Sequence, residues 1–211
     1  MAELEALAAA AAAPAGAALR LAQLRARARR PGEASMFWIE ARLRRVAVRL
    51  LPGEYFVSLE DMPIMTTLGS CIACCLWDRV TRVGGMNHFM LPEGAGDPGR
   101  YGSSAMARLI DELLELGAAR ASLQAKVFGG GQVMPGMGRL DVGERNTRFV
   151  LDHLRAQRIP VVAKDVLGIH PRKLCFMPGS GRALVKRLPA TRAATGVGRT
   201  RATATGPIVR R

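Results

Sequence analysis

The sequence predicts a single α/β domain with a mixed sheet over roughly residues 50–188. Three observations support this prediction. Short apolar runs typical of strands occur at both ends of the region, two segments with helical spacing of apolar residues lie between them, and turns rich in glycine or proline separate the elements. A hairpin expected near the end makes the sheet mixed rather than purely parallel. At 211 residues, the chain is long enough for one domain with a sizeable core plus tails.

The first half of this region contains the earliest predicted strands. Residues 55–57 are typical of a short strand, and residues 64–65 predict a strand that ends in the glycine-containing turn 66–70. Residues 71–77 form a compact apolar run, where periodicity alone does not distinguish a strand from a helix. Residues 86–91 predict a second buried strand, which a proline ends. The turn 66–70 therefore stands between two buried elements.

Helices and strands alternate in the second half of the region. Met106, Leu109, Ile110 and Leu113 share one helical face, and this helix stops at Gly117. The predicted elements in chain order are a helix over 103–116, a strand over 125–128, a helix over 142–157, a strand over 159–163, and a hairpin formed by 174–177 and 184–185.

The charge is strongly basic, with 31 Lys and Arg against 17 Asp and Glu and a formal net charge of +14. Much of the excess lies in residues 20–30, 42–49 and 186–211. We therefore interpret residues 1–47 as an Ala- and Arg-rich extension that is disordered or partly helical, and residues 189–211 as a disordered basic tail. Positive charge favours acidic partners.

Composition also excludes several classes of protein. Two Trp, two Tyr and six Phe provide little for base stacking, so we expect no nucleic-acid partner. Three of the four cysteines are clustered, which indicates a reducing compartment rather than a disulfide framework. The first apolar run follows no basic residue, and no apolar run is as long as a membrane span. We expect a cytoplasmic protein without membrane insertion. No feature of the sequence requires an oligomer, so we expect a monomer.

Cys71 and His88 are the candidate catalytic pair. Cys71 follows a turn at Gly69 and Ser70, and backbone N–H groups of such a turn can stabilise a thiolate and later an oxyanion. His88 lies in a predicted strand, and two neighbouring strands would bring its imidazole within hydrogen-bond reach of the sulfur. This pairing matches cysteine–histidine nucleophilic acyl transfer. On spacing alone, a buried core cysteine and a structural histidine are the commoner outcome.

A third polar group is needed to orient the imidazole. Thr66 is close in sequence to the turn and is the first candidate, with Thr67 and Asn87 as alternatives. Neither a metal nor a cofactor is predicted.

Three other motifs have weaker interpretations. Cys71-x-x-Cys74 is half of a zinc ligand set, but only the distant Cys175 and three histidines remain to complete it. A CxxC redox centre is equally poorly supported, and Cys74 and Cys75 are more simply core neighbours. The run Gly129–Gly131 lacks the spacing of a phosphate-binding loop, and we interpret it as a tight turn near the site.

Several motifs, in order along the chain, carry a resemblance to a known family. They are Glu-Tyr-Phe-Val-Ser from residue 54, Thr-Leu-Gly-Ser-Cys-Ile-Ala-Cys-Cys-Leu-Trp-Asp from 67, Val-Gly-Gly-Met-Asn-His-Phe-Met-Leu-Pro from 83, Arg-Tyr-Gly from 100, Lys-Val-Phe-Gly-Gly-Gly from 126, Gly-Glu-Arg-Asn from 143, and Ile-Pro-Val-Val-Ala from 159. Residues 48–188 strongly resemble the CheD family of chemoreceptor glutamine deamidases.

The resemblance implies a three-layer α/β/α fold for residues 48–188 and hydrolysis of chemoreceptor glutamine side chains to glutamate with release of ammonia. It places the family's cysteine on Cys71, its histidine on His88 and its assisting threonine on Thr66. Residues 167–171 depart from the Gly-rich, polar segment that the family often has before its Arg-Lys pair, so partner contacts there are not carried over. An alternative is a non-enzymatic regulator that binds a CheC-type phosphatase and chemoreceptors.

Overall fold

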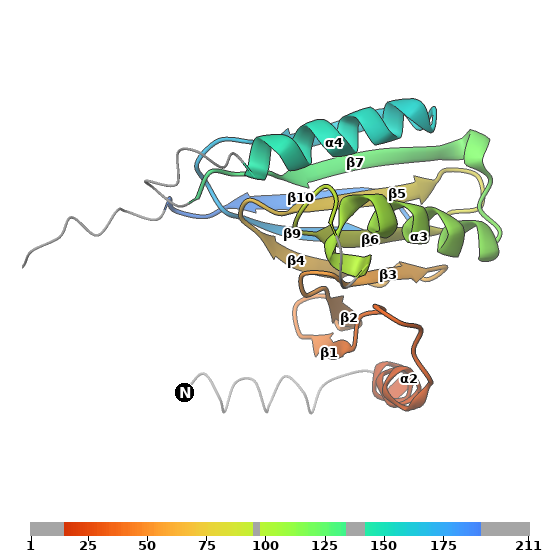
Figure 1. Ribbon diagram of the computed structural model, residues 1–211. Helices are drawn as coiled ribbons and strands as arrows, with labels where there is room; N and C mark the ends of the chain where they lie inside the picture. The colour runs from red at the N-terminus through yellow and green to blue at the C-terminus, as the bar shows by residue number, and fades with distance from the viewer. Residues whose placement is uncertain (1–14, 95–97, 134–141, 191–211) are drawn as a thin grey trace, which may run out of the picture.

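The structure is a computed structural model and describes residues 15–94, 98–133 and 142–190 (Figure 1). Residues 1–14 and 191–211, which the sequence assigns to the tails, lie outside the described residues. No helix in the described part of the chain combines the length and the apolar character needed to cross a membrane.

Two five-stranded sheets form the centre of the molecule. In spatial order, the first sheet contains β3 (Tyr55–Ser58), β6 (Gly84–Phe89), β5 (Ile72–Asp78), β7 (Leu123–Gly129) and β8 (Val161–Val166), and the second contains β1 (Met36–Glu40), β2 (Arg45–Arg49), β4 (Ile64–Leu68), β9 (Arg172–Met177) and β10 (Arg182–Arg187). Each sheet is mixed, because β7 with β8 and β2 with β4 are parallel pairs while the other pairs are antiparallel.

Helices α3 (Gly102–Glu115) and α4 (Val142–Ala156) cover one face of the first sheet (Figure 1). The apolar face that predicted the first helix packs there, with Met106, Leu109 and Leu113 fully buried against strand residues such as Ile72. A second core lies between the two sheets and contains Ile64, Phe176 and Met86, among others. The first sheet is therefore covered on both faces, which explains why β5 and β6 are almost continuously buried, including the polar Asn87 and His88 of β6.

The α/β class with mixed sheets and the predicted helices is confirmed. The structure contains two sheets where the sequence predicted one. The difference arises because the predicted hairpin, β9 and β10, pairs through β9 with β4 and so belongs to the second sheet.

The N-terminal region differs from the predicted extension of residues 1–47. Helix α2 (Ala15–Ala26) packs against β1 and β2, and β2 pairs with β4. Val46 and Val48 point into the second core, whereas Arg45 and Arg49 of the same strand are exposed. Two of the basic residues that suggested a solvated tail, Arg45 and Arg49, are therefore outward positions of an alternating strand.

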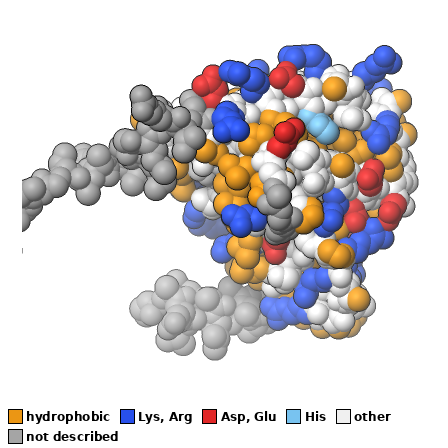
Figure 2. Space-filling model, in the orientation of Figure 1, with side chains coloured by type: hydrophobic (Ala, Val, Ile, Leu, Met, Phe, Trp, Pro, Cys, Tyr) orange, Lys and Arg blue, Asp and Glu red, His pale blue; other side chains and the backbone are white. Residues whose placement is uncertain are grey.

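Basic side chains are scattered over the face that Figure 2 shows, where they alternate with acidic and apolar ones. This face is unlike the continuous basic stripe that follows a nucleic-acid backbone.

Candidate active site

Cys71 lies in the short turn that connects β4 of the second sheet to β5 of the first. Its side chain is partly exposed and packs against the core between the sheets, whereas that of Ile72 enters the core under the helices. The chain crosses from one sheet to the other at this point, so the thiol stands at the rim of the inter-sheet layer rather than within a strand.

His88 occupies β6 directly opposite Ala73 of β5. Ala73 packs in the same inter-sheet core as Cys71, two residues earlier. Cys71 and His88 are therefore diagonal neighbours on one face of the sheet, a relationship that leaves their side chains within reach of each other. His88 is only 3% exposed.

Thr66 approaches His88 from the other sheet. Thr66 Oγ1 lies 2.9 Å from His88 Nδ1 and donates a hydrogen bond to the Leu50 carbonyl, also at 2.9 Å. A hydroxyl has a single proton, and the carbonyl can only accept it. Thr66 Oγ1 therefore accepts from His88 Nδ1–H, and this assigns the neutral imidazole a lone pair on Nε2. Among the described residues, Nε2 is buried without a hydrogen-bond partner.

The alternative orienting residues lie elsewhere. Asn87 faces helix α3, where its Oδ1 accepts from the Cys74 backbone N–H at 3.1 Å and its Nδ2 donates to the Ala105 carbonyl at 3.1 Å. Thr67 is exposed on the outer face of the second sheet. Of the three candidates for orienting the imidazole, only Thr66 contacts the His88 ring.

Three consecutive carbonyls of the Cys71 turn are held by the surrounding chain. Gly131 N–H donates to the Gly69 carbonyl at 2.8 Å, Asn146 Nδ2 to the Ser70 carbonyl at 3.0 Å, and Gly130 N–H to the Cys71 carbonyl at 2.8 Å. In a trans peptide the C=O and the following N–H point in opposite directions. The N–H groups of Ser70 and Cys71 are thus directed away from the Gly69 and Ser70 anchors, a preorganisation that suits an oxyanion hole, whereas Ile72 begins β5 and pairs with Phe89 of β6.

Gly129 ends β7 and Gly130 and Gly131 follow it beside the Cys71 turn; we call these three residues the glycine turn, and its glycines are needed for this approach. Gly129 has φ +111° and Gly130 has φ +65°, values that favour glycine. A Cβ on Gly129 would overlap the Cys71 carbonyl, and one on Gly130 would overlap Thr147 Oγ1. Larger residues would push the loop away from the nucleophile turn.

Asn146 is a structural partner that sequence reasoning missed. It is fully buried in α4, and Nδ2 donates to the Met90 carbonyl at 2.8 Å as well as to Ser70. Two carbonyl partners require two donors, so the amide orientation is determined. The available signal was its spacing with Val150 and Leu154, because a polar residue on an apolar helical stripe must find buried partners.

The loop 167–171, which departs from the family pattern, lies beside the glycine turn. Leu167 N–H donates to the Gly129 carbonyl at 2.9 Å, and Gln132 N–H donates to the Gly168 carbonyl at 2.7 Å. Arg172 is buried, pairs with Asp165 at 2.9 Å and donates to the His170 carbonyl at 3.0 Å. Within this loop, which these hydrogen bonds and the ion pair fix in place, Leu167 has φ 64°, which is unusual for a residue with a side chain of its size.

Burial sets the protonation state of the pair. It raises the pKa of the Cys71 thiol, and a hydrogen bond from the residue's own N–H only partly opposes that shift. It lowers the pKa of His88 to about 4, against a smaller opposing effect of the Leu50 carbonyl. The expectation that the turn lowers the thiol pKa is wrong in its net sign, because desolvation of the charged form outweighs one hydrogen bond. The resting pair is a neutral thiol and a neutral imidazole.

The other cysteines are core residues. Cys74 and Cys75 are buried in the first and second cores respectively, as the core-neighbour interpretation predicted, and all four cysteines are free thiols. Over residues 15–94, 98–133 and 142–190, no cluster of three or more His, Cys, Asp or Glu side chains is arranged to hold a metal ion.

Comparison with known proteins adds an independent observation. The family model described as CheD chemotactic sensory transduction matches residues 90–187. The chain is 61% identical over 171 residues to a probable chemoreceptor glutamine deamidase CheD 1 of Albidiferax ferrireducens, covering 80% of this chain and 73% of the relative. It is 55% identical over 147 residues to a probable chemoreceptor glutamine deamidase CheD of Thiobacillus denitrificans, covering 66% of this chain and 73% of the relative.

Proposed function

The chain belongs to the CheD chemotaxis family, and we propose that it is a protein-glutamine deamidase that converts glutamine side chains of chemoreceptors to glutamate. In this proposal Cys71 is the nucleophile, His88 is the general base and Thr66 orients the imidazole. Ser70 and Gly69 form the turn that supports the oxyanion. No metal or cofactor takes part in the proposed steps.

The observation that carries the proposal is the hydrogen-bond chain from Leu50 through Thr66 to His88. It assigns the proton to Nδ1 and leaves the lone pair on Nε2, on the sheet face that also bears Cys71. A base oriented by a third group beside a nucleophile is the arrangement that acyl transfer requires.

In the first half of the reaction, the neutral pair reacts with the substrate carboxamide. His88 Nε2 takes the thiol proton as the sulfur attacks the carboxamide carbon, so that a C–S bond forms and the carbonyl oxygen becomes an oxyanion. The N–H groups of the Cys71 turn stabilise that charge, a contribution of about 10²- to 10³-fold in rate for a single donor. Protonated His88 then gives its proton to the departing nitrogen, the C–N bond breaks, and ammonia leaves a thioester on Cys71.

In the second half, water hydrolyses the thioester. His88 Nε2 accepts a proton from water as its oxygen attacks the thioester carbon, and the C–S bond breaks as the proton returns to the sulfur. The product is glutamate, and the neutral pair is restored. Because proton transfer accompanies attack, a thiolate need not exist beforehand, which is consistent with the raised thiol pKa.

Incubation with a chemoreceptor cytoplasmic fragment tests the proposal. Peptide mass spectrometry of the fragment should show the mass change of glutamine-to-glutamate conversion with the wild-type chain and none with Cys71→Ala or His88→Gln. Conversion by Cys71→Ala would refute the assigned nucleophile. If the wild-type chain binds the fragment or a CheC-type phosphatase without forming product, this result would favour a non-enzymatic regulator over a deamidase.

A further inference from the structure

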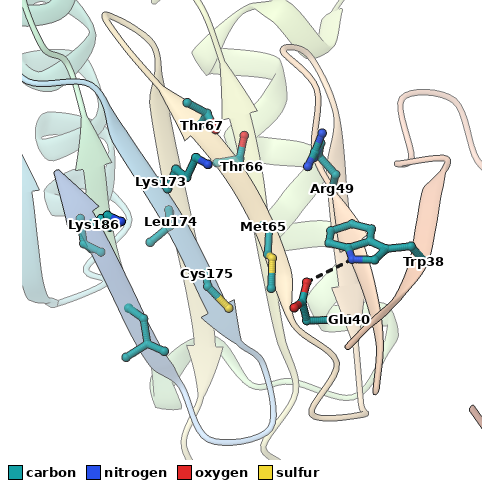
Figure 3. Close-up of a pocket in the computed structure, with 12 residues that line it drawn as sticks. Trp38, Glu40, Arg49, Met65, Thr66, Thr67, Lys173, Leu174, Cys175 and Lys186 are labelled. Atoms are coloured by element: carbon teal, nitrogen blue, oxygen red, sulfur yellow. Dashed lines mark hydrogen bonds between the residues drawn. The ribbon is translucent and has the colours of Figure 1, made fainter. Parts of the chain in front are cut away.

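A hollow of about 430 Å³ lies on the outer face of the second sheet, away from the inter-sheet core (Figure 3). Its lining includes Trp38, Met65, Cys175 and Leu184, and it contains neither Cys71 nor His88. We call this hollow the sheet groove. Leu184 is 57% exposed, and in the described chain no helix packs over this face. Of the proposed catalytic residues only Thr66 is in the lining, so the hollow is separate from the thiol and the imidazole.

The strand register arranges the groove in two rows. Met65, Cys175 and Leu184 are cross-strand neighbours and form an apolar row. The next outward row, one step closer to the end of β4, consists of Thr67, Lys173 and Lys186. An apolar row bordered by lysines thus leads along β4 toward its C-terminal end.

The groove is positively charged. Arg49 is paired with Met65 in the register and lies over the Trp38 ring, with its guanidinium carbon 5.5 Å from the ring centroid. With Lys173 and Lys186 it provides three cations, and none of them forms an ion pair with a described carboxylate. The carboxylate in the lining belongs to Glu40, which accepts a hydrogen bond from Trp38 Nε1 at 3.2 Å (Figure 3).

The groove and the candidate active site share strand β4. Thr66 and Thr67 both contribute to the lining, and the Thr66 hydroxyl also contacts His88. The chain then passes through Leu68 and the Gly69–Ser70 turn to Cys71. A partner lying along the groove toward the lysine row would therefore reach the rim where the thiol stands.

We propose that the sheet groove binds an acidic amphipathic helix of the chemoreceptor substrate and holds it beside Cys71, an inference that rests on the proposed function. The four strands β2, β4, β9 and β10 span about 14 Å, close to the 10–12 Å width of a helix with its side chains. The apolar stripe of the helix covers Met65, Cys175 and Leu184. Its carboxylates pair with Lys173, Lys186 and Arg49.

Charge also selects among occupants. The chain's own segment 191–211 carries arginines and no acidic residue, so its sign matches that of the groove. A neutral apolar partner would desolvate the three cations without compensation, which is unfavourable. An acidic helix satisfies both the apolar row and the cations.

Charge reversal in the groove tests the proposal by binding and by turnover. The variant Lys173→Glu/Lys186→Glu should raise KM for the receptor fragment by about tenfold or more and change kcat by less than about twofold. The milder Lys173→Gln/Lys186→Gln variant should raise KM less and keeps the test valid if the reversed chain folds poorly. Arg79→Glu/Arg158→Glu is the matched control, because both arginines are exposed, lie outside the groove and give the same change in net charge.

Binding is measured separately in the Cys71→Ala background, so that it does not depend on deamidation. The groove variant should lose about tenfold or more in affinity for the receptor fragment, and the control should not. A fragment with its acidic helix residues changed to lysine should regain affinity for the reversed groove. In chains that retain the thiol, Cys71 should react with iodoacetamide at the wild-type rate in both the Lys173→Glu/Lys186→Glu variant and the arginine control.

Two results would overturn the docking proposal. One is equal weakening in the groove variant and the control, which indicates only long-range charge, and the other is unchanged KM and affinity in the groove variant. If instead the wild-type chain binds the fragment through the groove but forms no product, the deamidase proposal fails while the docking surface stands.

Discussion

Replacement of Thr66 by valine removes one hydroxyl from the centre of the candidate site and little volume. That hydroxyl makes two hydrogen bonds of 2.9 Å, one donated to the Leu50 carbonyl and one accepted from His88 Nδ1–H. Thr66 and His88 are 5% and 3% exposed, so solvent does not readily replace the lost partner. A buried polar group without a partner costs about 1–3 kcal/mol. We expect Thr66→Val to lower the free energy of unfolding by about 2 kcal/mol.

The same change should lower deamidation more than stability explains. Without the Thr66 acceptor, the proton is no longer held on Nδ1, and the lone pair is no longer held on Nε2. We expect kcat/KM for a receptor fragment to fall by about 100-fold, measured well below the unfolding temperature. Thr66→Ser keeps the hydroxyl and should retain most activity. Thr81→Val, an exposed threonine in the β5–β6 turn, is the matched control.

Two results would show that the Thr66 hydroxyl does not have this role. Activity of Thr66→Val within about twofold of wild type would show that the hydroxyl does not orient the base. Equal losses in Thr66→Ser and Thr66→Val would show that the methyl group, rather than the hydrogen bond, matters at this position.

Three further predictions concern His88, Asn146 and Leu167. The lowered pKa of His88 keeps its imidazole neutral in the folded chain, so below the ordinary histidine pKa protonation favours the unfolded chain. The free energy of unfolding should therefore fall by about 2 kcal/mol between about pH 7 and about pH 5. Denaturant titrations of His88→Gln should lack this decrease. Asn146→Leu frees the Ser70 and Met90 carbonyls, and kcat should fall by about tenfold or more with a smaller change in KM; an unchanged kcat would contradict the role of this anchor. Leu167→Gly relieves a positive φ and should raise the free energy of unfolding by about 1 kcal/mol, whereas a clear loss of stability in thermal melts would show that the leucine side chain stabilises the loop.

Local pattern predicted most of the first sheet and both of its helices. Apolar runs bounded by turns identified β3 and β6, and they marked β5 as a buried element without deciding between strand and helix, while the 3.6-residue period identified α3 and α4. The pairing of strands was not predictable in the same way, because the partner of β4 is β9, more than a hundred residues later. The second sheet depends on that long-range contact, and no periodicity within β4 or β9 reports it.

For the candidate site, residue type and the family resemblance supplied the candidate residues, but the sequence did not reveal the effects of packing around them. Cys71, His88 and Thr66 were chosen from the sequence, and the structure places Thr66 on the imidazole. The sign of the thiol pKa shift depends on burial by two sheets, which a local turn does not reveal. Asn146 was missed for a similar reason, because its role comes from two carbonyls on distant parts of the chain.

The proposed mechanism requires a thioester between Cys71 and the substrate acyl group, which acid quenching during turnover would trap. Digestion of the quenched chain and mass spectrometry should show the peptide that contains Cys71 carrying the receptor peptide less ammonia. The adduct should be absent from Cys71→Ala, which should also form no glutamate. Product formed by Cys71→Ala, or an adduct on another residue, would show that Cys71 is not the nucleophile.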